Sequence, residues 1–242
     1  MNLNFPRSLM FAALAAMSAV STAQATNLVE VDGANVKFFY DADFWTGTAA
    51  VTGNSISFGL SDDYNVTAKS SSSTHHQDNQ HTDAVAGALF AVAKSGYNLS
   101  GAMGNRVSGT YSIPIYGGFT TFTLGSIFTA GSSYNNGVLG GGVGEDALYQ
   151  FNWWASTGRG AFSGAVQESL STTLDTTYKA VRVDTDFSWQ ALQDGVGTSN
   201  LTLGKISYDF SVSAVPEPET YAMLLAGLGL VGCAARRRKQ QA

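Results

Sequence analysis

Apolar and polar residues alternate along many short segments of this 242-residue chain. Between residues 181 and 189, apolar side chains and one threonine occupy every second position, and charged or hydroxyl side chains occupy the positions between them. Because successive side chains of a β-strand point to opposite faces, this period of two predicts strands with one buried face. The same period recurs in residues 36–40, 56–60, 107–115 and 206–212.

Turn-forming residues separate these segments, with Gly and Asn at positions where a chain commonly reverses. They occur at residues 52–54, 135–137, 194–195 and 199–200. Many short strands joined by such turns predict an all-β fold, an antiparallel β-sandwich, of which a jelly roll is one form. We expect residues 26–214 to form this single β-sandwich domain, because their length suits one core.

Three segments of the body depart from the alternation. Residues 83–94 fit either a capped helix or a buried strand, and their continuation into the strand-like residues 97–101 favours the strand. Residues 70–82 are polar without any apolar spacing, and residues 131–144 are rich in Gly and Asn. Both of these segments are predicted to be solvated loops.

The N-terminal segment has the three parts of a secretory signal. A short polar start with Arg7 precedes the apolar run at residues 9–20, and Ala23 and Ala25 follow at small-x-small spacing. This order predicts a signal peptide at residues 1–25, forming a helix that signal peptidase removes after Ala25. The apolar run is also too short to remain as a membrane-spanning anchor.

The C-terminal segment, residues 215–242, combines a proline motif, an apolar run and a basic cluster. Pro216, Glu217 and Pro218 come first, and the two prolines hold the backbone extended. Residues 221–235 are apolar or Gly throughout, and a helix of that length covers about 22 Å against about 30 Å of hydrocarbon. The basic cluster that follows is expected to stop translocation and stay cytoplasmic; it consists of Arg236, Arg237, Arg238 and Lys239.

This C-terminal arrangement resembles the PEP-CTERM protein-sorting signal. The resemblance implies that a membrane protease-transpeptidase, exosortase, cuts near Pro216–Pro218 and that the protein then reaches the cell surface or the extracellular matrix. It also implies a transient inner-membrane helix, whose apolar residues include Tyr221, Leu224, Leu225, Leu228, Leu230 and Val231. The alternative is a lasting single-span tail anchor, although such an anchor would usually be longer.

Charge and cysteine content narrow the expected role of the body. Residues 26–214 carry 8 basic and 16 acidic side chains, so no basic footprint for nucleic acid is present. The single cysteine, Cys233, lies in the apolar tail, and the body must therefore be stable without a disulfide. We expect an exported surface or matrix protein, associated with biofilm or exopolysaccharide, with a non-enzymatic structural role and no cofactor.

Exposed aromatic side chains offer an alternative function, because an exposed Trp can stack against a sugar ring. Trp153 and Trp154 are adjacent and would point to opposite faces of a strand, while Trp45 follows a predicted strand end. These three residues are the candidate carbohydrate-binding site, and the alternative for each is a place in the core. The ligand would be the exopolysaccharide of the matrix.

Metal binding and hydrolysis have weaker support. His75, His76 and His81 lie in the polar segment 70–82, which would not fix ligands in the geometry that a metal requires. The acidic pairs 41/43 and 62/63 do not supply the six to eight oxygens that calcium takes. We therefore predict no metal site and no catalytic residues, with an exported hydrolase as a further alternative because carboxylate pairs can meet in three dimensions.

Overall fold

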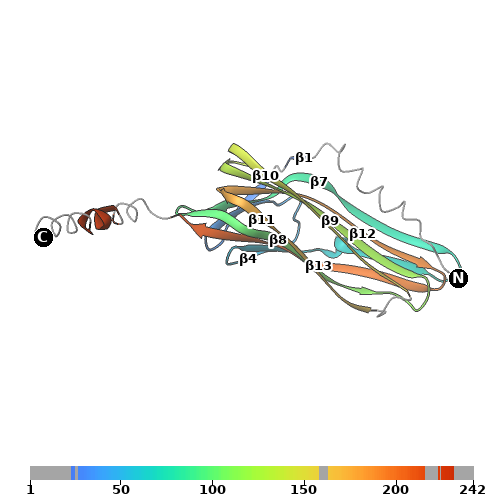
Figure 1. Ribbon diagram of the computed structural model, residues 1–242. Coiled ribbons are helices and arrows are strands. Elements are labelled where there is room, and N and C mark those ends of the chain that lie inside the picture. Colours follow the sequence, from blue (N-terminus) through green and yellow to red (C-terminus); the bar gives the residue numbers. More distant parts are fainter. Residues whose placement is uncertain (1–22, 25–26, 158–162, 216–222, 224, 232–242) are drawn as a thin grey trace, which may run out of the picture.

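The computed structural model describes residues 23–24, 27–157, 163–215, 223 and 225–231. Two antiparallel sheets pack face to face in an elongated sandwich, which confirms the predicted fold class (Figure 1). Sheet A has the strand order β10-β9-β12-β7-β3-β2, with the short β1 beside β7, and sheet B has the order β11-β8-β13-β5-β4, with β6 beside β13. The strands of sheet A are β1 (Ala23–Gln24), β2 (Leu28–Asp32), β3 (Val36–Asp41), β7 (His75–Ala93), β9 (Gly118–Asn135), β10 (Val138–Ser156) and β12 (Ala180–Asp194). Those of sheet B are β4 (Ala49–Thr52), β5 (Ser55–Gly59), β6 (Asn65–Ser70), β8 (Tyr97–Ser112), β11 (Ser163–Tyr178) and β13 (Gly197–Ala214), and a 3-10 turn, η1 (Asp62–Tyr64), precedes β6.

The connections give the sandwich two distinct ends. From β6 onward the chain crosses to the other sheet at every connection except the β9–β10 hairpin. The turns at residues 71–74, 113–117 and 195–196 meet at one end, which we call the distal end. At the opposite, proximal end, β13 finishes beside the turn at residues 94–96, where the Val215 amide donates to the Gly96 carbonyl at 2.8 Å. The C-terminal tail therefore leaves from the proximal end, as Figure 1 shows.

The core lies between the sheets and follows the alternation of the sequence. Along β12 the residues at 181, 183, 185, 187 and 189 are all buried, and those between them are partly exposed, as predicted. The largest fully buried side chains are aromatic, and they include Phe38, Phe58, Phe122, Phe128, Phe187 and Tyr208. Full burial of one such side chain contributes roughly 1.5–3 kcal/mol, so this layer supplies much of the stability of a body without disulfides.

Two polar contacts cross the middle of this apolar core. The Tyr208 hydroxyl of sheet B lies 3.1 Å from the Thr185 hydroxyl of sheet A, and Asn105 Nδ2 donates to Ser126 Oγ at 3.2 Å. Burial raises the pKa of Tyr208 to about 12, so the phenol stays protonated and able to donate. Because an unpaired buried polar group is costly, these contacts favour one alignment of the two sheets over others.

Two segments predicted as loops are strands, so those predictions were wrong. Residues 75–82 form the first half of β7, which pairs with β12 from Asp194↔His75 to Phe187↔Thr82. Its side chains are mostly exposed, so no apolar alternation marks this half of the strand. Residues 131–144 belong to the β9–β10 hairpin, whose turn is formed by Asn136 (φ 43°) and Gly137 (φ 83°). Two successive positive φ angles match the right-handed twist of paired strands.

Other predictions about turns and strands had mixed outcomes. Residues 83–93 continue β7 and are strand, as favoured, and turns occur at Gly53 and Gly195 as predicted. Ser199 and Asn200 form no turn: they lie inside β13, and Ser199 is buried. Ser199 is held there because its hydroxyl donates to Gln193 Oε1 at 2.8 Å, a contact that the local sequence does not reveal.

The β9–β10 hairpin folds over the outside of sheet A near the proximal end. The ring of Tyr134 lies 4.7 Å from that of Phe39 and 5.2 Å from that of Phe90, measured between centroids. Phe90 is consequently buried, although it stands on the outer face of the sheet. This small outer cluster lies toward the proximal end of sheet A, and the described outward side chains of the distal half are partly or fully exposed.

Candidate functional site

The open distal half of sheet A presents a row of side chains that crosses four strands. Trp154 on β10 is paired with Thr121 on β9, which is paired with Gln190 on β12, which is paired with Asn79 on β7. Neighbouring strands lie about 4.8 Å apart, so the row spans about 14 Å. We call this row and its neighbours on the same face the β12 face.

Most groups on the distal part of the β12 face are uncharged hydrogen-bonding groups. Gln190 Nε2 donates to Asn79 Oδ1 at 2.5 Å, which fixes both amides against the sheet. The next row contains Thr123, Ser188 and His81. Trp154 is 39% exposed at the β10 end of the first row. An exposed indole beside amides and hydroxyls can stack against and hydrogen-bond a neutral polyhydroxylated ligand.

The β12 face becomes charged toward the middle of the sheet, where β7 is irregular. Register shifts on either side of Thr185 mark a bulge in β7, and Gly87 there has a φ of 74°. The Gly87 amide, displaced from the strand ladder, donates to Asp184 Oδ1 at 2.7 Å. Arg182 faces the same carboxylate, with Nη2 2.9 Å from Oδ2 and Nε 2.8 Å from Oδ1. Asp184 thus accepts the hydrogen bond of the Gly87 amide at the bulge and also forms an ion pair with Arg182.

Asp186 stands two residues further along the same face in a different environment. Burial raises the pKa of its carboxyl, and nearby His81 opposes that rise. Because the folded-state pKa is above the ordinary value, folding is favoured more when Asp186 is protonated. As the pH rises through that raised pKa, Asp186 ionises and the free energy of unfolding decreases.

Neutralising the two aspartates is expected to change stability in opposite directions. Asp186→Asn should raise the melting temperature at pH 7, and this gain should vanish below about pH 4, where the parent carboxyl is also protonated. Asp184→Ala should cost about 1–3 kcal/mol, because it leaves the Gly87 amide and Arg182 without their acceptor. Thermal unfolding of both variants across pH 3–8 measures these changes, and a destabilised Asp186→Asn at pH 7 would contradict the burial argument.

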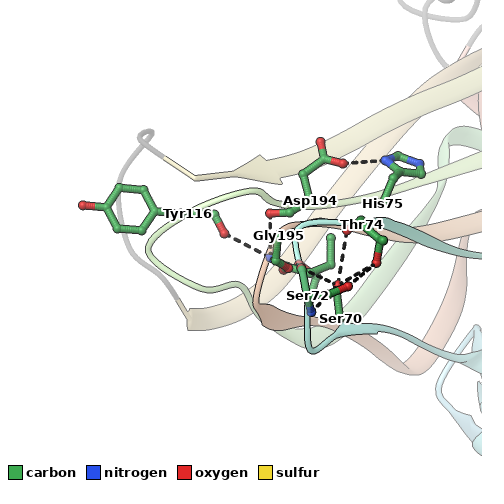
Figure 2. A network of polar contacts seen from close by, with 9 residues as sticks. Ser70, Ser72, Thr74, His75, Tyr116, Asp194 and Gly195 are labelled. Atoms are coloured by element: carbon green, nitrogen blue, oxygen red, sulfur yellow. Dashed lines mark hydrogen bonds and ion pairs between the residues drawn. The ribbon is translucent and has the colours of Figure 1, made fainter.

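A second polar cluster ties the loops of the distal end together (Figure 2). The buried Gln193 side chain donates through Nε2 to the carbonyl oxygens of Tyr116 and Gly195, at 3.1 and 3.3 Å. His75 Nδ1 lies 2.5 Å from Asp194 Oδ1, and this contact raises the pKa of His75. The buried Gln193 amide therefore joins the loop at residues 113–117 to the turn at residues 195–196.

These loops expose apolar side chains at the tip of the molecule. Tyr116 is 78% exposed, and Figure 2 shows its ring pointing away from the polar cluster. Ile115 and Val196, on the same two loops, are also exposed. The distal end therefore presents exposed apolar side chains next to the β12 face.

The three predicted sugar-stacking tryptophans have different positions. Trp45 is 3% exposed, is stacked on Phe58 with ring centroids 4.2 Å apart, and donates from Nε1 to the Ala88 carbonyl at 2.9 Å. Its ring therefore has no free face for a sugar and belongs to the core. Trp153 pairs with Phe122 along the backbone, and its side chain lies outside the described residues. Trp154 is exposed on the β12 face and remains a candidate.

Sequence reasoning missed the polar partners of Trp154. Asn79 was assigned to a loop, and Gln190 and Thr121 were not considered as ligand-binding residues. The available signal was the polar half of the alternation in residues 182–190, which identified an outward face of β12 but not the strands beside it.

The predicted sorting residues lie only partly within the described chain. Pro216, Glu217, Pro218, Tyr221, Leu224 and the basic cluster are outside it. Leu225, Leu228, Leu230 and Val231 are helical and exposed. In the described part of the chain, no helix has the length and apolar character needed to cross a bilayer. The predicted signal helix at residues 1–25 also falls almost wholly outside the described residues.

The residues weighed for metal binding are engaged in ordinary local contacts. Asp41 Oδ1 accepts the Asp43 amide at 2.9 Å, and Asp62 and Asp63 lie in η1. Among the side chains that the structure describes, no three of His, Cys, Asp or Glu gather as metal ligands would.

Comparison with known proteins identifies the tail. The model of the PEP-CTERM protein-sorting motif matches residues 214–239, beginning at the last residue of β13. No curated protein matches the chain. Solved structures with some likeness include a mutant VP2 protein of infectious bursal disease virus, at 12% identity over 64% of this chain and 41% of that one, with a TM-score of 0.17. A structure of the Gx strain of that virus is similar at 11% identity over 70% and 48% of the chains, with a TM-score of 0.14. The chain spans less than half the length of either.

The body and the tail together define an exported β-sandwich protein with a C-terminal sorting signal. The chain carries a PEP-CTERM protein-sorting motif, which indicates export, transient attachment to the membrane and processing by exosortase. The motif match covers only residues 214–239, so the activity of the sandwich has to be argued from its own residues.

Proposed function

We propose that this protein is a non-enzymatic component of the cell surface or extracellular matrix, released by exosortase after a signal peptide has directed its export. The observation that carries the proposal is the position of the tail relative to the open surface. The sorting motif follows β13 at the proximal end, while the β12 face and the exposed tip lie toward the distal end. The 17 steps from Gly197 to Ala214 along β13 correspond to about 55 Å. A protein held by its tail would therefore present these surfaces well away from the bilayer.

A structural rather than catalytic role is supported by the carboxylates of the β12 face. Asp184 and Asp186 are neighbours on one face of β12, the spacing at which an acid–base pair could operate. However, Asp184 is engaged by Arg182 and by the Gly87 amide. Both residues stand on an open sheet face, which does not enclose a substrate or exclude water.

A second candidate function is binding of exopolysaccharide through the β12 face. Trp154, Thr121, Gln190 and Asn79 form one continuous row of stacking and hydrogen-bonding groups. The row is flat and about 14 Å long, which suits an extended chain of several sugar rings better than a small molecule.

Pull-down on exopolysaccharide from the producing organism tests this candidate. We expect the parent protein to be retained and Trp154→Ala to lose about 5- to 150-fold in retention, since stacking is worth about 1–3 kcal/mol by analogy with bases on aromatic rings. Tyr116→Ala, which removes an exposed ring outside the row, is the matched control and should be retained. If the parent does not bind, then the proposed sugar recognition is wrong, while the proposed matrix role is unaffected. Recovery of the protein only from the cytosol would contradict the proposed export.

A further inference from the structure

β10 and β2 end the main strand order of sheet A, and β11 and β4 end that of sheet B; β10, β2 and β4 carry features that prevent further pairing. β4 has only four residues, and β2 has five, including the charged Glu30 and Asp32. β10 carries Glu145 and Asp146, and two register shifts interrupt its pairing with β9 between Gly140 and Asp146. Short edges, charges and bulges are the usual means by which proteins avoid edge-to-edge association.

β11, the remaining one of these four strands, is long and regular over most of its length, and its register shift lies between Leu174 and Tyr178. It pairs with β8 in twelve consecutive steps, from Ser163↔Ser112 to Leu174↔Gly101, without a bulge. Its 16 residues contain no proline and no basic side chain, and its only charges are Glu168 and Asp175. Within the described residues, no strand pairs with its other side. An uninterrupted edge of this length is a template for another strand.

Leu170, near the middle of β11, gives a second and independent indication. Its side chain is on the same face as Val166 and Leu174, both of which are buried in the core. Leu170 is nevertheless 36% exposed. An apolar side chain on the core side of an open edge is what a neighbouring strand would cover.

We propose that β11 pairs with β11 of a second copy of this protein, antiparallel and centred on Leu170, so that sheet B continues from one copy into the other. A two-fold axis makes this interface self-complementary: Leu170 faces its own counterpart, and Ser169 faces Ser171. A second copy supplies a partner strand of the same length and composition.

The register centred on Leu170 also separates the acidic side chains. Glu168 lies opposite Thr172 and Asp175 lies opposite Ala165, so no carboxylate meets another. In an alternative register, with the two strands shifted by two residues, Leu170 of one copy would lie opposite Glu168 of the other. The centred register covers the exposed leucine and avoids that apolar–charged contact.

Antiparallel pairing has a consequence for the order of events. Because the two β11 strands run in opposite directions, the proximal ends of the two copies, where the tails leave, point in opposite directions. Two copies held by their tails in one membrane cannot adopt this arrangement. Pairing therefore follows release of at least one copy; this timing, unlike the pairing itself, rests on the proposed processing by exosortase.

Cysteine cross-linking in the producing cells tests both statements. In a Cys233→Ser background, Leu170→Cys places the two Cα atoms about 4.5–5.5 Å apart in the proposed dimer, within reach of a disulfide. Thr173→Cys, an exposed residue of the same strand, is the control, because its two copies would be about 20 Å apart. We expect oxidised dimer from Leu170→Cys in released protein and none from Thr173→Cys.

A second pair of variants tests the edge without cysteines. Ser169→Lys with Ser171→Lys places like charges opposite each other across the proposed interface, and the released protein should then sediment as a monomer. Thr110→Lys with Thr198→Lys adds the same charge on strands that are paired on both sides, and should leave the dimer intact. A monomeric parent at its highest soluble concentration, or equal cross-linking of Leu170→Cys and Thr173→Cys, would overturn the proposed pairing. Cross-linking of Leu170→Cys between unprocessed copies in one membrane would overturn the timing and leave the pairing standing.

Discussion

Replacing Trp45 with alanine is expected to destabilise the body by about 3–5 kcal/mol, enough to leave much of it unfolded. The indole stacks on Phe58 of sheet B and donates to the Ala88 carbonyl of sheet A, so one side chain joins the two layers. Its removal creates a large cavity and leaves the Ala88 carbonyl without that donor. Denaturant unfolding followed by tryptophan fluorescence measures the loss.

Trp154→Ala is the matched control for this prediction, because it removes the same side chain from an exposed position. It should change the free energy of unfolding by no more than about 0.5 kcal/mol. Equal loss of stability in the two variants would mean that Trp154 is part of the core. An unaffected Trp45→Ala would mean that the packing between the sheets does not depend on the Trp45 contacts.

Changing Pro216, Glu217 and Pro218 together to alanine is expected to abolish release of the protein. The three changed residues follow the end of β13 at Ala214, so the body should fold and be exported as before. Without the two prolines the backbone is no longer held extended at the point of recognition, and exosortase should not process the tail. Fractionation of cells into medium, surface and membrane measures the outcome, with the variant expected only in the membrane.

Glu219→Ala is the control for the triple variant, since it changes a neighbouring residue outside the Pro-Glu-Pro motif. It should be released like the parent. If the triple variant reached the medium at the parent's level, then the motif would not direct processing, and the tail would have some other role.

The sequence was sufficient to predict the fold class because the body buries one face of most strands. Val181, Val183, Phe187 and Trp189 alternate with polar residues, and every one of them is in the core. The prediction failed where no face is buried, as in residues 75–82 of β7, where polar side chains on both faces read as a loop. Pairing with β12, which is distant in sequence, forms that strand, and local periodicity carries no record of such pairing.

The candidate site was predictable only in part, for the same reason. Trp154 was recognised from its residue type, but Trp45 has the same type and lies in the core. The row that joins Trp154 to Asn79 depends on the register of four strands, and the spacing of residues along one strand does not fix it. The sorting signal, by contrast, is a linear motif, and it could be read directly from the order of its residues.

The most direct test of this account is the intact mass of the protein recovered from cells and from the medium. The account predicts a released form that begins near Thr26 and lacks Tyr221 and everything after it, with the whole of β2 to β13 retained. Recovery only of membrane-bound protein that still carries Arg236, Arg237 and Arg238 would contradict it, because the tail would then be a permanent anchor.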